Sequence, residues 1–124
     1  MPAEELTIQP LAGRDGLRIL RITGPIVLQS IFPFQSALRA ETADVLILDM
    51  AAVPHVDSAG IGTLVLTHVS RQNAGRVFAL AGVNERVRTV LQVTRVEQVL
   101  TTFPTLAEAE TALAGKRMDA RPAI

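Results

Sequence analysis

The amino-acid sequence predicts an α/β domain, with a mixed sheet of four to five strands that carries about four helices. Two observations lead to this prediction. From residue 43 onward, short apolar runs alternate with segments of helical periodicity, an order typical of parallel strands joined by crossover helices. Before them, Leu6, Ile8 and Leu11 indicate a first short strand and residues 17–24 a second one. The turn sequence AGRDG lies between them, which predicts an antiparallel hairpin.

The composition fits one domain and excludes several kinds of site. The chain has 124 residues, of which 48% are hydrophobic, enough for a single core. Cysteine is absent, which excludes disulfides, thiolate metal sites and cysteine nucleophiles. Lys and Arg together number 12, as do Asp and Glu, so we expect no nucleic-acid stripe and no polybasic membrane anchor.

The two ends and the longest apolar runs give the expected boundaries. The start, MPAEELT, does not resemble a signal peptide, and no apolar run reaches the roughly 18 residues that a membrane span requires. We expect one cytoplasmic domain over residues 1–116 and a flexible C-terminal tail over 117–124, with no membrane partner, no cofactor and no metal.

In the first half, Asp15-Gly16 suits the tight hairpin turn. A helix is predicted from apolar positions at helical spacing, Ile31, Phe34, Ala37 and Leu38. It is expected to begin near Phe32, with Pro33 in its first turn. We expect at least two of Ile31, Phe32 and Phe34 in the core.

The second half begins with DVLILDM at 44–50, a continuous apolar run typical of a strand buried on both faces. The next helix has a predicted inner stripe of Ile61, Leu64, Val65, His68 and Val69, and Gly75 suits its left-handed cap. Residues 76–82 are predicted to form a strand. Arg71 and Arg76 flank the turn before it and are expected at a solvated rim.

The last third is predicted to hold two helices and a weak strand. Asn84 suits the N-cap of a short helix with the inner face Val87, Val90, Leu91 and Thr94. Residues 96–104 contain a short extended segment. Thr105 and Gly115 suit the two ends of a final helix.

One stretch, PHVDSAGIGTL at 54–64, carries the functional prediction. It follows the most apolar strand and leads into a helix, so Ser58 is expected at the carboxyl edge of the sheet, where such folds usually place their sites. Gly60 and Gly62 allow the helix to lie close to the sheet, or another surface to approach its backbone. The first interpretation of Asp57-Ser58 is a helix cap, which either residue forms well.

A second interpretation is a serine nucleophile. It needs a base, and the chain has two histidines. His68 is about three helical turns from Ser58, roughly 15 Å along the axis, and is out of reach. His55 is close enough, but G-x-S-x-G is absent and no oxyanion hole is evident. We therefore predict no catalytic residue and no enzymatic activity.

The third interpretation is phosphorylation of Ser58. A phosphate would bring about −1.5 to −2 charges to a helix N-terminus, which tolerates anions. The fold would persist, while a partner at this edge would meet new charge beside Asp57. The sequence then predicts a switch whose readout is binding.

The stretch from VLILDMAAVPHVDSAGIGTL through RVFALAG to VEQVL resembles the STAS domain, the module of bacterial anti-sigma factor antagonists. The matching residues are Asp49, Asp57, Ser58, Gly60, Ile61 and Gly62, followed by residues 74–77 and 87–91. The resemblance covers about residues 5–114. It implies a non-enzymatic regulator that binds an anti-sigma factor serine kinase, is phosphorylated on Ser58, and is reset by a serine phosphatase.

The resemblance also implies a partner surface around Ser58. The expected contact residues are Asp57, Ser58, Ala59, Gly60, Gly62, Thr63, Pro25, Ile26 and Val27. One departure concerns this surface, because the family often has acidic residues where this chain has Pro25-Ile26-Val27. The alternative is a constitutive scaffold or assembly subunit, such as a homodimer or a stressosome-like module, that uses the apolar segment 25–34.

Overall fold

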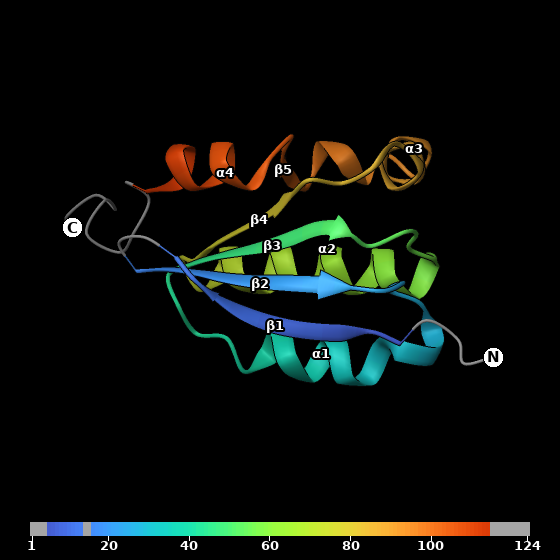
Figure 1. Cartoon of the computed structure of the whole chain (residues 1–124), viewed down its shortest axis with the longest axis horizontal. Coiled ribbons are helices and arrows are strands. Elements are labelled where there is room, and N and C mark those ends of the chain that lie inside the picture. The colour runs from blue at the N-terminus through green and yellow to red at the C-terminus, as the bar shows by residue number, and fades with distance from the viewer. Residues whose placement is uncertain (1–4, 14–15, 115–124) are drawn as a thin grey trace.

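The computed structural model describes residues 5–13 and 16–114, which form a five-stranded mixed sheet with helices on both faces (Figure 1). The strand order is β1-β2-β3-β4-β5. The first pair, β1 (Thr7–Ala12) and β2 (Leu17–Thr23), is antiparallel. The strands β3 (Val45–Ala52), β4 (Val77–Ala81) and β5 (Thr101–Phe103) each run parallel to the strand before them in the order. The predicted fold class and hairpin are confirmed.

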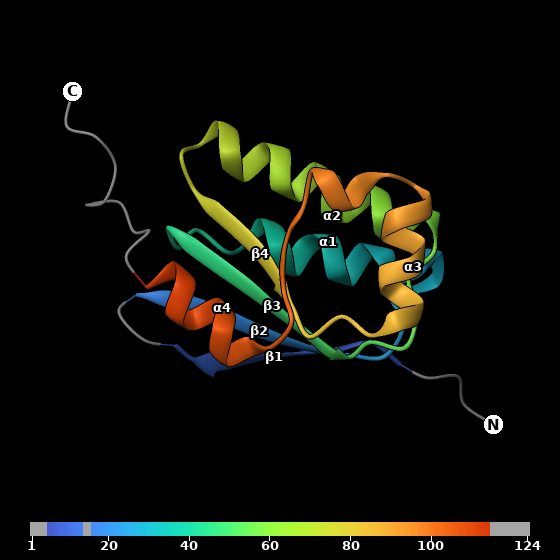
Figure 2. The ribbon, with the colours of Figure 1, turned by 90° about the horizontal axis from the view of Figure 1, so that it is seen from above.

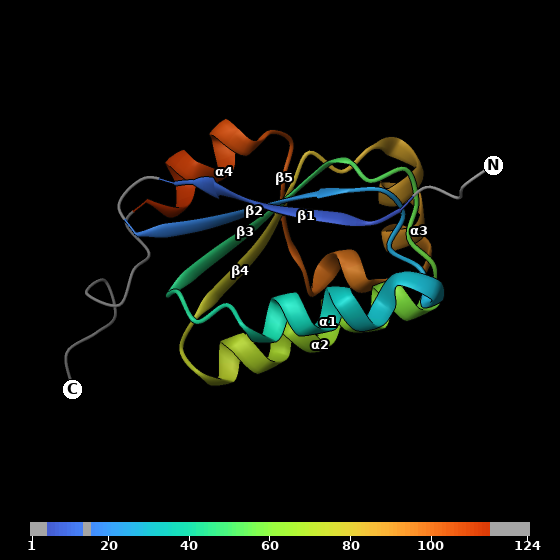
Figure 3. The same cartoon turned by 60° about the horizontal axis from the view of Figure 1, so that its bottom comes forward.

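The helices are divided between the two faces of the sheet. The helices α1 (Ile31–Arg39) and α2 (Ser58–Asn73) lie side by side on one face (Figure 3). The other face carries α4 (Leu106–Leu113), which lies toward the viewer in Figure 2. Beyond the carboxyl end of β4 lies α3 (Glu85–Val93), and two 3-10 turns, η1 (Leu28–Ser30) and η2 (Val96–Gln98), complete the fold.

The strand β3 is the centre of the core, because its side chains pack on both faces. Residues 45–48 are all fully buried, as the apolar run predicts. Leu46 and Leu48 join the cluster under α1 and α2, which includes Phe34 and Leu64. Val45 and Ile47 join the cluster under α4. This two-sided packing fixes the edge of the sheet from which α2 departs.

Several expectations about individual residues need correction. Val69 is 41% exposed and Thr94 is also exposed, so neither belongs to an inner face. The Thr94 hydroxyl instead donates to the carbonyl oxygen of Val90 at 2.7 Å. Phe32 is 75% exposed, whereas Ile31 and Phe34 are buried, which confirms that two of the three belong to the core.

Other boundaries are close to those predicted. The strand β3 extends to Ala52, and Gly75 follows α2 with a φ of 76° in the left-handed region, as predicted. Asp15, Gly115 and the tail 117–124 lie outside the described residues. Within the described ranges, no helix is long and apolar enough to cross a membrane.

Candidate functional site

The site lies where the chain leaves β3 and enters α2, at the carboxyl ends of the central strands (Figure 1). Backbone hydrogen bonds fix this loop to the segment after β2. The amide of Ile26 donates to the carbonyl oxygen of His55 at 3.2 Å, and the amide of Asp57 donates to the carbonyl oxygen of Ile26 at 3.3 Å. Ile26 and Val56 thereby form an isolated parallel bridge. The start of α2 is held by backbone pairing rather than by side chains alone.

Asp57 is the residue that caps α2. Its Oδ1 accepts from the amide of Gly60 and its Oδ2 accepts from the amide of Leu28, both at 3.0 Å. Burial by itself would raise the pKa of Asp57. The amides of Gly60, Leu28 and Ala59 and the nearby His55 outweigh burial and hold the pKa below 3.8. One ionised carboxylate therefore joins the helix start to the loop after β2.

Ser58 is left free by this arrangement. It is the first residue of α2 and is exposed, and its hydroxyl has no hydrogen-bond partner within the part of the chain that the structure describes. The sequence allowed either Asp57 or Ser58 to cap the helix, and the structure assigns the cap to Asp57. A hydroxyl that serves no internal purpose is thus presented to solvent at a helix N-terminus.

The two glycines of the motif lie in different surroundings. A Cβ on Gly60 would collide with the carbonyl oxygen of Ile26 and the side chain of Val56, so only glycine lets α2 pack this closely. A Cβ on Gly62 would meet no atom of residues 5–13 or 16–114 within 4 Å. Gly62 is exposed one helical turn after Ser58, and the packing of this domain gives no reason for a glycine there.

The surroundings of Ser58 do not form a catalytic dyad. A shallow depression of about 420 Å³ adjoins it, and among the described residues that line it Asp57 is the only titratable one. Its other walls are mainly apolar, with Ile61, Val65 and Val90 among them. The Nδ1 atom of His68 is buried away from water, and it has no hydrogen-bond partner among the residues that the structure describes. Neither histidine lines the depression.

The predicted contact residues do not all reach the surface. Pro25, Ile26 and Gly60 are buried, while Val27 and Ala59 are partly exposed. Thr63 is also buried, and its hydroxyl donates to the carbonyl oxygen of Ala59 at 3.0 Å and accepts from Gln35 at 3.2 Å. Ile26 and Thr63 are therefore buried in this structure, and their part in a partner surface stays a prediction.

The environment of Arg71 differs from the solvated rim that the sequence predicts. It is buried, and its guanidinium donates to the carbonyl oxygens of Val77, Glu41 and Ala43. Burial lowers its pKa, and nearby Arg76 lowers it further against the opposite effect of Glu41 and Asp44. The expectation of a solvated rim is wrong for Arg71, because the guanidinium ties the end of α2 to the segment that enters β3.

One further carboxylate, Asp49, completes the inventory of polar groups. Asp49, which matches the family pattern, is buried and accepts from Arg21 at 3.2 Å on the face that carries α4. Among the described residues, no group of three or more His, Cys, Asp or Glu side chains could hold a metal ion. The distinctive feature of the edge is the free Ser58 beside the ionised Asp57.

Comparison with known proteins places this geometry in a family. The family model described as "STAS domain" matches residues 10–109. A putative anti-sigma factor antagonist from Thermotoga neapolitana is 33% identical over 64 residues. The aligned part is 52% of this chain and 57% of that relative, little more than half the relative's length.

Solved structures share the fold at low sequence identity. A crystal structure of an anti-sigma factor antagonist from Mycobacterium paratuberculosis has a TM-score of 0.77 at 22% identity, covering 87% of this chain and 93% of that one. The phosphorylated form of the Bacillus cell fate determinant SpoIIAA has a TM-score of 0.66 at 14% identity, covering 86% and 99%. Because the family model spans most of the chain, and these structures share its five-stranded fold, the chain belongs to the STAS domain family.

Proposed function

We propose that this protein is an anti-sigma factor antagonist-like regulator that binds an anti-sigma factor serine kinase and is switched by phosphorylation of Ser58. The observation that carries the proposal is the free, exposed Ser58 hydroxyl on a helix start that Asp57 already caps. The curated relative from Thermotoga neapolitana carries the name of a putative anti-sigma factor antagonist, which supports this class of function. A solved structure with this fold is of a phosphorylated form, which supports the switch.

The charge around Ser58 supports a switch that acts on binding and leaves the fold intact. A phosphate there would bring about −1.5 to −2 charges to the N-terminus of a helix of 16 residues, where the helix dipole favours an anion. The same phosphate would stand beside the ionised Asp57. The surface, which now carries the single negative charge of Asp57, would become strongly negative. A partner docked over this edge would then face like-charge repulsion or desolvation, and the complex would weaken.

Gly62 supports the position of the partner. A glycine inside a helix costs roughly 0.5–1 kcal/mol relative to alanine, and this domain gains no packing from its absence of a side chain. Close approach of another protein's backbone would explain the residue. The proposed contact surface is therefore Asp57, Ser58, Ala59, Gly62 and Val27, with the buried Pro25, Ile26, Gly60 and Thr63 acting as its support.

The first test is phosphorylation in vitro. The protein is incubated with each serine kinase of the anti-sigma factor type from its own genome, together with ATP, and the phosphate is mapped by mass spectrometry. We expect a single phosphate on Ser58, and none on Ser58→Ala. Ser36→Ala is the matched control, because Ser36 is an exposed serine on α1 and its removal is expected to change nothing. Failure of every such kinase to modify Ser58 contradicts the switch.

A serine phosphatase is the expected partner for the reverse step. The phosphorylated protein is incubated with candidate phosphatases and the mass is followed with time. Loss of one phosphate from Ser58, without loss from a control phosphopeptide, supports the assignment. A phosphate that none of the candidates removes argues that the modification is not reversed in this way.

A second function, a constitutive scaffold or homodimer, is favoured by one specific observation. Leu28 and Phe32 are 62% and 75% exposed, although their neighbours Ile26, Ile31 and Phe34 are buried. Both exposed side chains lie in the apolar segment 25–34, where the family's usual acids are absent. A second copy or another subunit that covers them would remove large apolar side chains from water.

Analytical ultracentrifugation separates this alternative from the switch. If the segment mediates assembly, the wild type sediments as a dimer or larger at micromolar concentration, and Phe32→Ser shifts it to a monomer. Val93→Ser is the matched control, because Val93 is also 75% exposed but lies on α3. A wild-type protein that remains a monomer at every concentration argues against self-assembly.

A further inference from the structure

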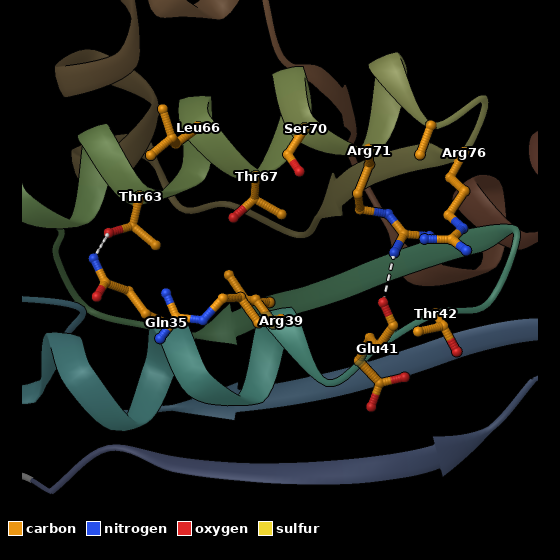
Figure 4. A pocket seen from close by; sticks show the side chains of 12 residues that line it. Gln35, Arg39, Glu41, Thr42, Thr63, Leu66, Thr67, Ser70, Arg71 and Arg76 are labelled. Atoms are coloured by element: carbon orange, nitrogen blue, oxygen red, sulfur yellow. Dashed lines mark hydrogen bonds between the residues drawn. The ribbon is translucent and has the colours of Figure 1, made fainter.

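A groove between α1 and α2 is separate from the depression beside Ser58. It measures about 280 Å³, and its lining runs from Gln35 and Thr63 (Figure 4) to Ala74, the residue after α2. This volume approaches the lower end of the range for pockets that hold small molecules. Its walls combine hydroxyl groups, arginines and a few apolar side chains, so its chemistry indicates what it can bind.

Positive charge is in excess along the groove. Arg39, Arg71 and Arg76 all line it. The guanidinium of Arg71 donates to three backbone carbonyl oxygens. It therefore adds positive charge to the groove but is held away from a ligand. The side chains of Arg39 and Arg76 make no ion pair within the ranges that the structure describes. Their guanidinium groups are therefore available to a ligand.

The acidic groups nearby neutralise this charge only in part. Glu41 is the one acid among the described lining residues, and its two carboxylate oxygens accept from Arg18 at 2.8 and 3.1 Å. Arg18 is not part of the groove wall. The nearness of Arg76 also lowers the pKa of the buried Arg71, although Glu41 and Asp44 act in the opposite sense. The two guanidinium groups repel each other, and a bound anion would relieve that repulsion.

The remaining lining residues favour a ligand that is larger than an inorganic ion. Figure 4 shows the hydroxyl groups of Thr67 and Ser70 pointing from α2 into the groove, between Arg39 on one side and Arg71 with Arg76 on the other. Leu38 is buried in the floor, and Leu66 at the lip is 70% exposed. A ligand with an apolar portion would cover Leu66 and place its anionic group among the hydroxyls and arginines.

We propose that this groove binds a small amphipathic organic anion, a phosphate monoester or carboxylate with a short apolar chain, held by Arg39, Arg76 and the hydroxyls of Thr67 and Ser70. Guanidinium groups suit such anions because they donate two parallel hydrogen bonds to a phosphate or carboxylate. The site is independent of Ser58 and does not need the proposed phosphorylation. A small molecule could then bind the domain on a different face from the proposed partner surface around Ser58.

The test is a titration of the ¹⁵N-labelled protein followed by amide chemical shifts, with hexyl phosphate as the probe. We expect saturable shifts at Thr67, Ser70 and Ala74, and weaker binding of inorganic phosphate, which lacks the apolar chain. Hexylamine, with the same chain and the opposite charge, is expected not to bind. Equal binding of hexyl phosphate and hexylamine would show that only the apolar chain is recognised, which would overturn the proposal.

Variants locate the site. Arg39→Gln and Arg76→Gln are each expected to weaken hexyl phosphate binding by about tenfold or more, the size of one charge-assisted hydrogen bond. Arg86→Gln is the matched control, because Arg86 is an exposed arginine on α3. Arg71 is left intact, since its loss would disturb the fold. Unchanged affinity in both groove variants, or absence of saturable shifts at millimolar probe, overturns the proposal.

Discussion

At the scale of single residues, the division of labour between Asp57 and Ser58 determines what the edge can do. Aspartate and serine are both good N-caps, so the sequence alone could not choose between them. The choice depends on Leu28, which is 29 positions away in the chain and donates its amide to Asp57. Local propensity predicts that this helix begins with a cap, and only the tertiary contact shows which hydroxyl or carboxylate forms it.

The cap predicts a measurable and pH-dependent stability. Asp57→Ala should lower the free energy of unfolding at pH 7 by about 1–2 kcal/mol, because two amides lose their acceptor. Since the pKa of Asp57 is lowered in the folded state, its contribution is present above pH 3.8 and is lost as the pH falls through the folded-state pKa. Urea unfolding of wild type and variant should therefore converge in acid.

Asp57→Asn is the control for this prediction. It keeps an oxygen for the amide of Gly60, but cannot ionise and cannot offer a second acceptor to Leu28. Its loss of stability at pH 7 should be smaller than that of the alanine variant. A difference between wild type and Asp57→Ala that stays constant from neutral to strongly acidic pH would show that the carboxylate is not the cap described here.

At the scale of elements, α2 is shaped by two glycines with opposite roles. Gly62→Ala should raise the free energy of unfolding by roughly 0.5–1 kcal/mol, because the new methyl group meets nothing and alanine favours the helix. Gly60→Ala should lower it, because the methyl group collides with the Ile26 backbone. Urea unfolding of the two variants measures both effects side by side.

The same pair tests the proposed contact surface. If a partner approaches the backbone at Gly62, then Gly62→Ala weakens binding to the anti-sigma factor although the domain itself becomes more stable. Opposite changes in stability and affinity are hard to produce by general damage. A variant that is more stable and binds as tightly as wild type would remove Gly62 from the surface.

The elements also show where sequence patterns stop being informative. Helical spacing gave α2 and most of its buried stripe, but it assigned Val69 to the inside, and that side chain is exposed. It also placed Arg71 in solvent, since arginine is mostly a surface residue. The burial of Arg71 depends on three carbonyl groups from the loop before β3 and from β4, and no local pattern reports them.

At the scale of the whole molecule, the alternation of apolar runs and helical segments was enough to predict the sheet, the hairpin and the edge where Ser58 lies. The order of the elements limits the topology, because parallel neighbours need crossover helices. Which of the predicted contact residues face solvent could not be predicted. Ile26 and Thr63 are buried by the bridge to Val56 and by the contact of α1 with α2, both of which join distant parts of the chain.

The architecture also explains why a modification here would be local. Ser58 stands at the rim, while the core lies between the helices and both faces of β3. Ser58 belongs to neither core cluster, so charge added there would lie outside the packed core. Phosphorylation of Ser58 would then change the surface charge of the domain and leave its fold unchanged.

The most direct measurement is the affinity of the anti-sigma factor partner for the unmodified and the Ser58-phosphorylated protein, determined by calorimetry with unfolding followed in parallel. The account predicts that phosphorylation weakens binding by at least about tenfold, and that the free energy of unfolding changes by less than about 1 kcal/mol. Equal affinity for the two forms, or weakened binding accompanied by loss of the folded domain, would contradict it.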